Sequence, residues 1–171
     1  DHQSWLGNTL SEIAQEKLGI ARQNRPLIWG ASSCIPGCGK FVSSTGSKVY
    51  KLGEQFYTKE GAECFTIIVS DDAGKPITFN SLKYTDILSD TKVTAIQALV
   101  AAEIRLNEKL TQHVLEDLKV RGRFHRTSYQ GVPVILDVAH NPAAAELLSQ
   151  RLAGSKGQIL AVASVLHDKD W

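Results

Sequence analysis

Lys17 is the residue of this sequence whose position most strongly suggests chemistry. It follows Leu10, Ile13 and Ala14 at helical spacing, so it should lie on the apolar side of a short helix. A lysine held among apolar groups loses its proton more readily, because desolvation penalises the ammonium form. The neutral amine can capture carbon dioxide as a carbamate, which turns a cation into a carboxylate-like metal ligand. The alternative is a lysine whose stem covers apolar surface while its charge favours the helix C-terminus.

His2 lies upstream of this helix and is a natural ligand for a divalent metal ion. A carbamylated Lys17 and His2 could together hold such an ion beside a phosphate group. Taken alone, His2 is more often a surface or capping histidine, and that alternative stays open.

A second group of polar residues follows the apolar run 132–136. Asp137 should end a strand, and His140 should begin the next helix, at the sheet edge where open α/β sheets bind ligands. The helix N-terminus adds backbone N–H donors for an anion. Asp137 could accept from ribose hydroxyls or pair with a cation, or it could only hold the loop together with Asn141. Arg123 could clamp a phosphate or nucleotide, although an arginine between two domains is usually only solvated.

Several elements should position these residues in the first part of the chain. A capping box formed by Thr9 and Glu12 predicts a helix over residues 10–18, which Gly19 should end in the C′ role. Apolar runs and turn residues predict a strand at 27–30 and a hairpin formed by 64–69 and 76–79. Helices are expected at 91–106 and 110–118, with a weak one near 41–50.

The second part of the chain has a different order of elements. Residues 121–123 interrupt the pattern as a linker, and a strand is expected at 131–139. Asn141 as N-cap and Pro142 at N1 predict a helix over 143–152, and a second strand should follow at 158–166. This β-α-β unit would begin a parallel sheet. The sequence therefore predicts an incomplete α/β domain up to about residue 122 and the start of a second one.

The composition excludes several classes of protein. The 171 residues include 19 basic and 18 acidic side chains without a long run of one sign, so neither nucleic acid nor an anionic membrane is an expected partner. The longest apolar run is too short to cross a membrane, and three sparse cysteines are no disulfide framework, so the cytoplasm is the expected location. The sequence contains no methionine, and both ends fall within motifs, which indicates an internal fragment.

Four motifs resemble one family, in matching order and spacing. DHQSWLGNTLSEIAQEKLGI resembles the DHxxxLGxTxxxIAxEKAGI signature of the folylpolyglutamate synthase/dihydrofolate synthase family, within the Mur ligase superfamily. RGRF resembles its PGRF linker, ILDVAHNPAAAELL its DVAHNP segment and SVLHDKD its MLxDKD segment. The resemblance spans nearly the whole chain and is weakest between residues 31 and 90.

The resemblance implies the fold in more detail. Residues 1–122 would be the C-terminal part of the P-loop-type central ATPase domain of a Mur ligase. Residues 123–171 would be the linker and first β-α-β unit of the Rossmann-like C-terminal Mur ligase domain. The phosphate-binding loop, a further metal-binding Glu and the pteridine-binding loops would precede Asp1, so the chain alone should be inactive.

The resemblance also implies an activity, the ligation of a folate-type carboxylate to the amino group of L-glutamate. ATP would phosphorylate dihydropteroate or tetrahydrofolate, and glutamate would attack the acyl phosphate, giving ADP and phosphate. His2 would be a Mg²⁺ ligand, Lys17 would be carbamylated (N6-carboxylysine), and His140 would lie near the reacting groups. Members of the family are generally monomers, so a monomer is expected.

ATP contacts can also be carried over. Arg123 and Asp137 would contact ATP, and Thr91 stands where the family has an ATP-contacting Asn. Arg121 stands where the family's linker has Pro. These two departures leave the adenine contact and the linker geometry open.

Three other functions compete with this one. A UDP-N-acetylmuramoyl-peptide (Mur) ligase shares the DxAHNP and lysine features, but RGRF argues against it. A metallohydrolase would use His2, carbamylated Lys17, Asp137 and His140 without ATP. A non-catalytic nucleotide-binding or structural fragment would carry no carbamate. The choice between a bifunctional enzyme and one that only extends folate chains depends on the pteridine site.

Overall fold

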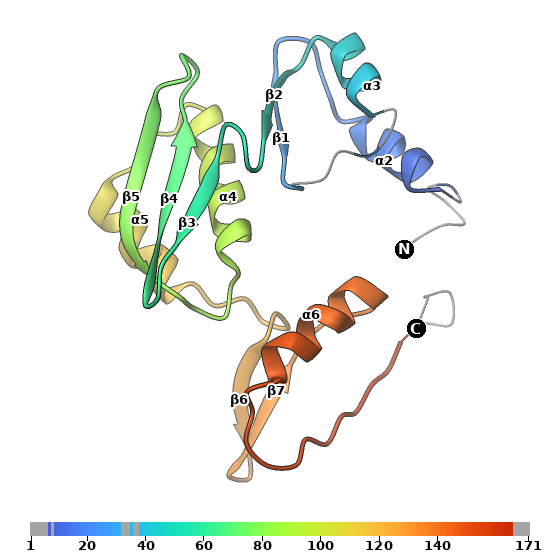
Figure 1. The fold of residues 1–171 in the computed structure, drawn as a ribbon, viewed down its shortest axis with the longest axis vertical. Helices are drawn as coiled ribbons and strands as arrows, with labels where there is room; N and C mark the ends of the chain where they lie inside the picture. Colours follow the sequence, from blue (N-terminus) through green and yellow to red (C-terminus); the bar gives the residue numbers. More distant parts are fainter. Residues whose placement is uncertain (1–6, 8, 32–34, 36–37, 166–171) are drawn as a thin grey trace. The chain divides into compact units, whose positions relative to one another are not determined.

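The computed structural model describes residues 7, 9–31, 35 and 38–165 of the chain (Figure 1). The described residues fall into two compact units, an N-terminal unit spanning Thr9–Lys119 and a C-terminal unit that begins at Val120 and with which Gly7 is grouped. Each unit is built on its own sheets and helices, and each is described by itself below.

Helix α2 (Leu10–Leu18) opens the N-terminal unit as the capping box predicted. The Thr9 hydroxyl accepts from the Glu12 N–H at 3.2 Å, and the Glu12 carboxylate accepts from the Thr9 N–H at 3.0 Å. The helix ends at the expected place, but the predicted C′ role of Gly19 is wrong. Gly19 has a right-handed φ of −54°, and its N–H bonds back to Glu16 in a tightened last turn.

A short parallel sheet follows, formed by β1 (Pro26–Trp29) and β2 (Lys48–Lys51). The predicted first strand is confirmed. The weak helix expected near 41–50 is displaced, because α3 spans Cys38–Thr45 and the remaining residues enter β2. Gly46, with a φ of +66°, makes the turn between them, since a left-handed backbone favours glycine. Helices α2 and α3 share a small core with β1, made of Ala14, Leu18, Leu27, Cys38 and Val42.

An antiparallel sheet forms the larger core of this unit. Its strand order is β3 (Tyr57–Glu60), β4 (Cys64–Ser70) and β5 (Pro76–Lys83), so the predicted hairpin is confirmed and β3 is an addition. Helix α4 (Ser89–Ala101) packs on β4, and α5 (Glu108–Asp117) packs on β5. The fully buried side chains here include Phe56, Phe65, Ile67, Val69, Leu82 and Val93.

Helix α4 ends five residues earlier than the predicted range 91–106. Glu103 has a left-handed φ of +60°, its N–H bonds to the Val100 carbonyl at 2.9 Å, and the Ile104 N–H bonds to the Leu99 carbonyl at 3.0 Å. These two bonds form a Schellman motif, in which the left-handed residue is usually glycine. Because glutamate occupies that position, the sequence carried no stop signal. Helix α5 agrees with its prediction.

The C-terminal unit begins with a hairpin that the sequence analysis missed. Strands β6 (His125–Tyr129) and β7 (Val132–Leu136) pair antiparallel. Gln130 and Gly131 both have positive φ, 49° and 81°, as a two-residue type I′ turn requires. Helix α6 (Pro142–Leu152) then starts as predicted, since the Asn141 side chain accepts from the Ala144 N–H at 2.9 Å.

The predicted β-α-β unit is wrong for the described residues. Strand β7 pairs with β6 and not with a parallel neighbour, and residues 158–165 form no strand. Leu160 and Val162 in this segment are 87% and 93% exposed. An apolar run becomes a strand only when another strand offers its backbone groups, and here the local turn at Gln130 and Gly131 supplies the partner of β7 instead.

None of the helices in the described part of the chain is long and apolar enough to cross a membrane.

Candidate functional site

The turn that carries Arg123 is fixed to the loop after β7. On one side of Arg123, the Gly122 carbonyl accepts from the Val138 N–H at 2.9 Å. On the other side, the Phe124 N–H donates to the Asp137 carboxylate at 2.7 Å. The two polar motifs singled out in the sequence, RGRF and DVAHNP, therefore meet within the C-terminal unit. Arg123 itself is exposed.

Gly122 is required by this arrangement. Its φ is +72°, and a Cβ placed on it would lie 3.0 Å from the Val138 side chain. Phe124 also has a positive φ, 48°, which costs a non-glycine residue about 1–2 kcal/mol. A backbone held in two such conformations persists only when its surroundings fix it.

The ring of Phe124 supplies part of that fixation. Phe124 is 2% exposed, and the guanidinium carbons of Arg151 and Arg126 lie 3.7 Å and 4.9 Å from its ring centroid. Arginine stacked on an aromatic face is attracted by the ring's negative charge density. Arg151 comes from the last turn of α6 and Arg126 from β6, so Phe124 links the turn to α6 and to β6.

Asp137 performs the structural role that the sequence analysis kept as an alternative. One carboxylate oxygen accepts from the Phe124 N–H, and the other accepts from the Ala139 N–H at 2.8 Å. A carboxylate oxygen can accept two hydrogen bonds, so these contacts do not exhaust its capacity. Asp137 is exposed and can therefore hold the loop and still accept from a ligand hydroxyl.

His140 lies in the same loop, just before α6. Its Nδ1 is 2.8 Å from the Val138 carbonyl oxygen. A carbonyl only accepts hydrogen bonds, so Nδ1 must carry a proton, and the lone pair of a neutral ring is then on Nε2. The loop therefore fixes the tautomer of His140, as a catalytic or ligand-binding histidine requires.

Lys17 lies in the last turn of α2, but its environment differs from the prediction. The side buried against α3 and β1 carries Ala14 and Leu18, while Lys17 is exposed and Leu10 is 74% exposed. The argument that apolar neighbours desolvate Lys17 is therefore wrong for the described residues. An exposed lysine remains accessible to carbon dioxide and to a ligand.

Thr91 lies exposed in the first turn of α4, whose N-cap Leu88 offers no side-chain hydrogen bond. A carboxylate of β3 binds a side chain at this end of the helix. Glu60 accepts from the Ser89 hydroxyl at 2.8 Å and from the Tyr84 hydroxyl at 2.7 Å. Burial alone would raise the pKa of Glu60, but hydrogen bonds from Tyr84, Thr58 and Ser89 hold it below its ordinary value. Sequence reasoning missed this contact, because Glu60 precedes Ser89 by 29 residues.

The predicted metal ligands cannot be assembled from the described residues. Residues 9–31, 35 and 38–165 hold no cluster of three or more His, Cys, Asp or Glu side chains with metal-site geometry. His2 lies outside the described residues, as does the HDKD segment at 167–170. Lys17 and Thr91 belong to the N-terminal unit, and Arg123, Asp137 and His140 to the C-terminal unit.

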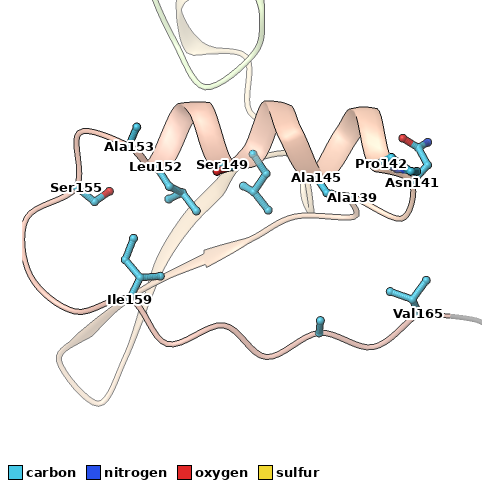
Figure 2. A pocket seen from close by; sticks show the side chains of 12 residues that line it. Ala139, Asn141, Pro142, Ala145, Ser149, Leu152, Ala153, Ser155, Ile159 and Val165 are labelled. Carbon is cyan, nitrogen blue, oxygen red and sulfur yellow. The ribbon is translucent and has the colours of Figure 1, made fainter. Parts of the chain in front are cut away.

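A cavity of about 810 Å³ lies between α6 and the extended segment that ends at Val165 (Figure 2). Ala145 and Leu152 line it from the helix, and Ile159 and Val165 line it from the segment. Among the described residues that line it, most are apolar, Asn141, Ser149 and Ser155 are polar, and none is charged.

Comparison with known proteins identifies what the chain resembles. No model of a protein family matches the sequence. The dihydrofolate synthase/folylpolyglutamate synthase of Escherichia coli K12 is 31% identical over 172 residues, which cover 99% of this chain and 39% of that enzyme. E. coli FolC in complex with DHPP and ADP matches with a TM-score of 0.86 and 31% identity, over 99% of this chain and 40% of that one.

A third match includes further ligands. A bifunctional folylpolyglutamate synthase/dihydrofolate synthase with Mn, AMPPNP and L-glutamate bound has a TM-score of 0.75 at 26% identity, over 90% of this chain and 36% of that one. This chain thus spans about 40% of the length of the relatives it matches. The resemblance indicated by the motifs is confirmed across nearly the whole chain, which by sequence and by fold matches the folylpolyglutamate synthase/dihydrofolate synthase family.

Proposed function

We propose that this chain is part of an ATP-dependent ligase that joins L-glutamate to dihydropteroate or a folate. The E. coli relative, which matches 99% of the chain, carries both activities in its name. The solved structures it resembles bind ADP and DHPP, or AMPPNP, Mn and L-glutamate. The observation that carries the proposal is the joining of the Arg123 turn to the Asp137 loop, because it brings the motif that carries Arg123 together with the Asp137 carboxylate and a histidine of fixed tautomer.

The reaction has two steps. A carboxylate oxygen of the pteroate or folate attacks the γ-phosphorus of ATP, which forms an acyl phosphate and releases ADP. The neutral amine of glutamate then attacks the acyl carbon. The amide forms as the acyl C–O bond breaks, phosphate leaves with its electron pair, and the nitrogen loses one proton to solvent. Both steps move negative charge between oxygens, and positioned cations lower the barrier by stabilising that charge.

The C-terminal unit supplies residues for the nucleotide. Arg123 is exposed on a fixed turn and can donate in a bidentate manner to a phosphate. Asp137 retains acceptor capacity for a ribose hydroxyl. His140 lies before the N-terminus of α6 and would orient groups near the transferred phosphoryl. Thr91, exposed at the start of α4, would offer its hydroxyl to the adenine in place of the family's Asn.

Lys17 and His2 would hold Mg²⁺. The exposed amine of Lys17 can form a carbamate, in which one nitrogen–carbon bond forms with carbon dioxide and a proton leaves the nitrogen. Carbamate oxygen and imidazole nitrogen are both donors suited to a divalent cation. Bound there, the ion would offset charge on the phosphoryl group. Because the described environment of Lys17 does not desolvate it, this assignment rests on the resemblance alone.

We also propose that residues 1–122 belong to the central ATPase domain and 123–171 to the start of the C-terminal domain. The boundary between the two described units at Val120 supports the position of this division, while Gly7 is grouped with the second unit. The chain contains no GxxxxGK[ST] phosphate-binding loop, and GCGK at 37–40 is followed by Phe41 where the loop needs Ser or Thr. We therefore expect the 171-residue chain alone to be inactive.

The test is a ligation assay on the protein encoded by the complete open reading frame that contains this sequence. We expect ADP release only when ATP, L-glutamate and a pteroate or folate are all present, with one glutamyl residue added to the acceptor in mass spectrometry. Separate reactions with dihydropteroate and tetrahydrofolate distinguish a bifunctional enzyme from a chain-extending one. Ligation of a muramoyl peptide, or metal-dependent hydrolysis without ATP, would refute the proposal.

A further inference from the structure

Helix α4 places a lysine in the core of the N-terminal unit. Lys92 is 1% exposed, and its Nζ lies 5.4 Å from the centroid of the Phe65 ring on β4. Among the residues that the structure describes, that Nζ atom has no hydrogen-bond partner. A buried ammonium without a partner is unfavourable, so Lys92 has two ways to avoid the cost: it can lose its proton, or it can find a carboxylate.

The strands that α4 packs against offer no carboxylate that is available to pair with the Lys92 ammonium. Helix α4 packs on β1, β3 and β4, and β1 contains no ionisable residue. Glu60 of β3 is exposed and bonded to Tyr84 and Ser89. The other ionisable groups of α4, β3 and β4 are Asp90, Tyr57, Lys59 and Cys64.

Helix α5 does offer one. Phe65, whose ring Lys92 contacts, pairs with Leu82 of β5, and the next residue, Lys83, bonds to Glu116 of α5. Burial lowers the pKa of Lys92, and attraction to the Glu116 carboxylate opposes that effect. The Glu116 carboxylate accepts from the Gln112 side chain at 3.3 Å and from the Lys83 N–H at 3.4 Å. Hydrogen bonding from Gln112 is the largest effect that lowers the pKa of Glu116, with smaller contributions from Lys83 and Lys92. Both hydrogen bonds are long, so the ionised carboxylate is loosely held.

We propose that Lys92 and Glu116 form a proton-operated latch between α4 and α5, in which the neutral amine packs on Phe65 and the protonated ammonium turns to the Glu116 carboxylate. The proton comes from solvent and adds to the Lys92 nitrogen. The protonated state requires the two side chains to approach each other. The latch is a property of this chain's own core and does not depend on the proposed ligase activity.

The first test compares urea unfolding of the wild-type chain and of Lys92→Met over a series of pH values. The unfolded chain binds a proton on Lys92 up to its ordinary pKa of 10.5, while the folded chain releases it at lower pH. The free energy of unfolding of the wild-type chain therefore rises with pH between the lowered pKa of Lys92 in the folded chain and 10.5. We expect Lys92→Met to unfold at higher urea than wild type at neutral pH, with the difference closing as the pH approaches 10.5. Lys59→Met, at an exposed lysine of β3, is the matched control and should show no such convergence.

The second test titrates Lys92 directly by NMR in the wild-type chain, and so does not depend on how any Lys92 variant folds. We expect its side-chain resonances to titrate below the ordinary lysine pKa of 10.5, and the backbone amides of Leu115 and Glu116 to shift with the same midpoint. In Glu116→Gln the midpoint should fall further, because the opposing carboxylate charge is lost. The latch is refuted if Lys92 titrates at the ordinary lysine pKa of 10.5, or if the resonances of the α5 amides do not shift with it.

Discussion

Removal of the Asp137 carboxylate should release the turn that carries Arg123. Asp137→Ala abolishes two hydrogen bonds to an ionised acceptor, from the Phe124 N–H at 2.7 Å and the Ala139 N–H at 2.8 Å. Such bonds contribute about 1.5–3 kcal/mol each. The Ala139 bond is exposed, so water replaces much of it, while the Phe124 bond is partly buried. We therefore expect a loss of about 2 kcal/mol from the local stability of the turn.

Amide hydrogen exchange of Phe124 measures this loss directly, because exchange requires the turn to open. A change of about 2 kcal/mol corresponds to exchange about 30-fold faster in Asp137→Ala. Asp137→Asn keeps one acceptor oxygen and should give an intermediate rate. Glu146→Ala removes an exposed carboxylate from α6 of the same unit and should leave the rate unchanged.

Two results would refute the reasoning. If Phe124 exchanges at the wild-type rate in Asp137→Ala, the carboxylate does not hold the turn. If Glu146→Ala accelerates exchange as much as Asp137→Ala, the effect comes from net charge and not from the two N–H contacts.

Three further predictions follow from the described contacts and the proposed function. In the complete protein, Lys17→Ala should abolish ligation and Lys17→Glu should restore part of it. Unchanged turnover in Lys17→Ala would refute the proposed role of a Lys17 carbamate. Gln97 is 0% exposed and bonds to both backbone groups of Ser70, at 2.8 and 2.9 Å. Gln97→Leu should therefore lower the free energy of unfolding by about 2–4 kcal/mol in urea titrations, while an unchanged midpoint would contradict that pairing. Glu60 has a folded pKa below its ordinary 4.5, so its contribution is present above that pH and lost as the pH falls through the folded pKa. Glu60→Gln should thus be less stable than wild type at neutral pH. If the difference in stability between the two persists in acid, it does not come from the Glu60 charge.

Local signals in the sequence were sufficient where a few neighbouring residues decide the structure. The capping box at Thr9 and Glu12 fixed the start of α2, and Asn141 followed by Pro142 fixed the start of α6. In both cases a side chain satisfies an N–H group two or three positions along, so that spacing in the sequence is also proximity in space. The apolar alternation that predicted the β4–β5 hairpin is local in the same sense.

The predictions failed where distant or unusual residues decide the structure. Glu103 ends α4 in a conformation usually reserved for glycine, and Gln130 occupies a turn position usually taken by Asn or Asp. The burial of Lys92 and Gln97 was also unforeseen, because helical periodicity treats both as solvent-facing residues. Only the position of Ser70 at the end of β4 explains why a glutamine is satisfied there.

The candidate site shows why a motif does not by itself reveal what its residues contact. Asp137 was a candidate for ATP, yet its two oxygens bind the backbone of the very motif that carries Arg123. An Asp137 variant that loses nucleotide affinity could thus have lost a ribose contact, or only the geometry of Arg123. Asp137→Asn separates these causes if Phe124 exchange and nucleotide affinity are measured in the same variant of the complete protein. Affinity that falls while the turn stays protected indicates a direct contact, whereas affinity that falls in proportion to the loss of protection indicates positioning.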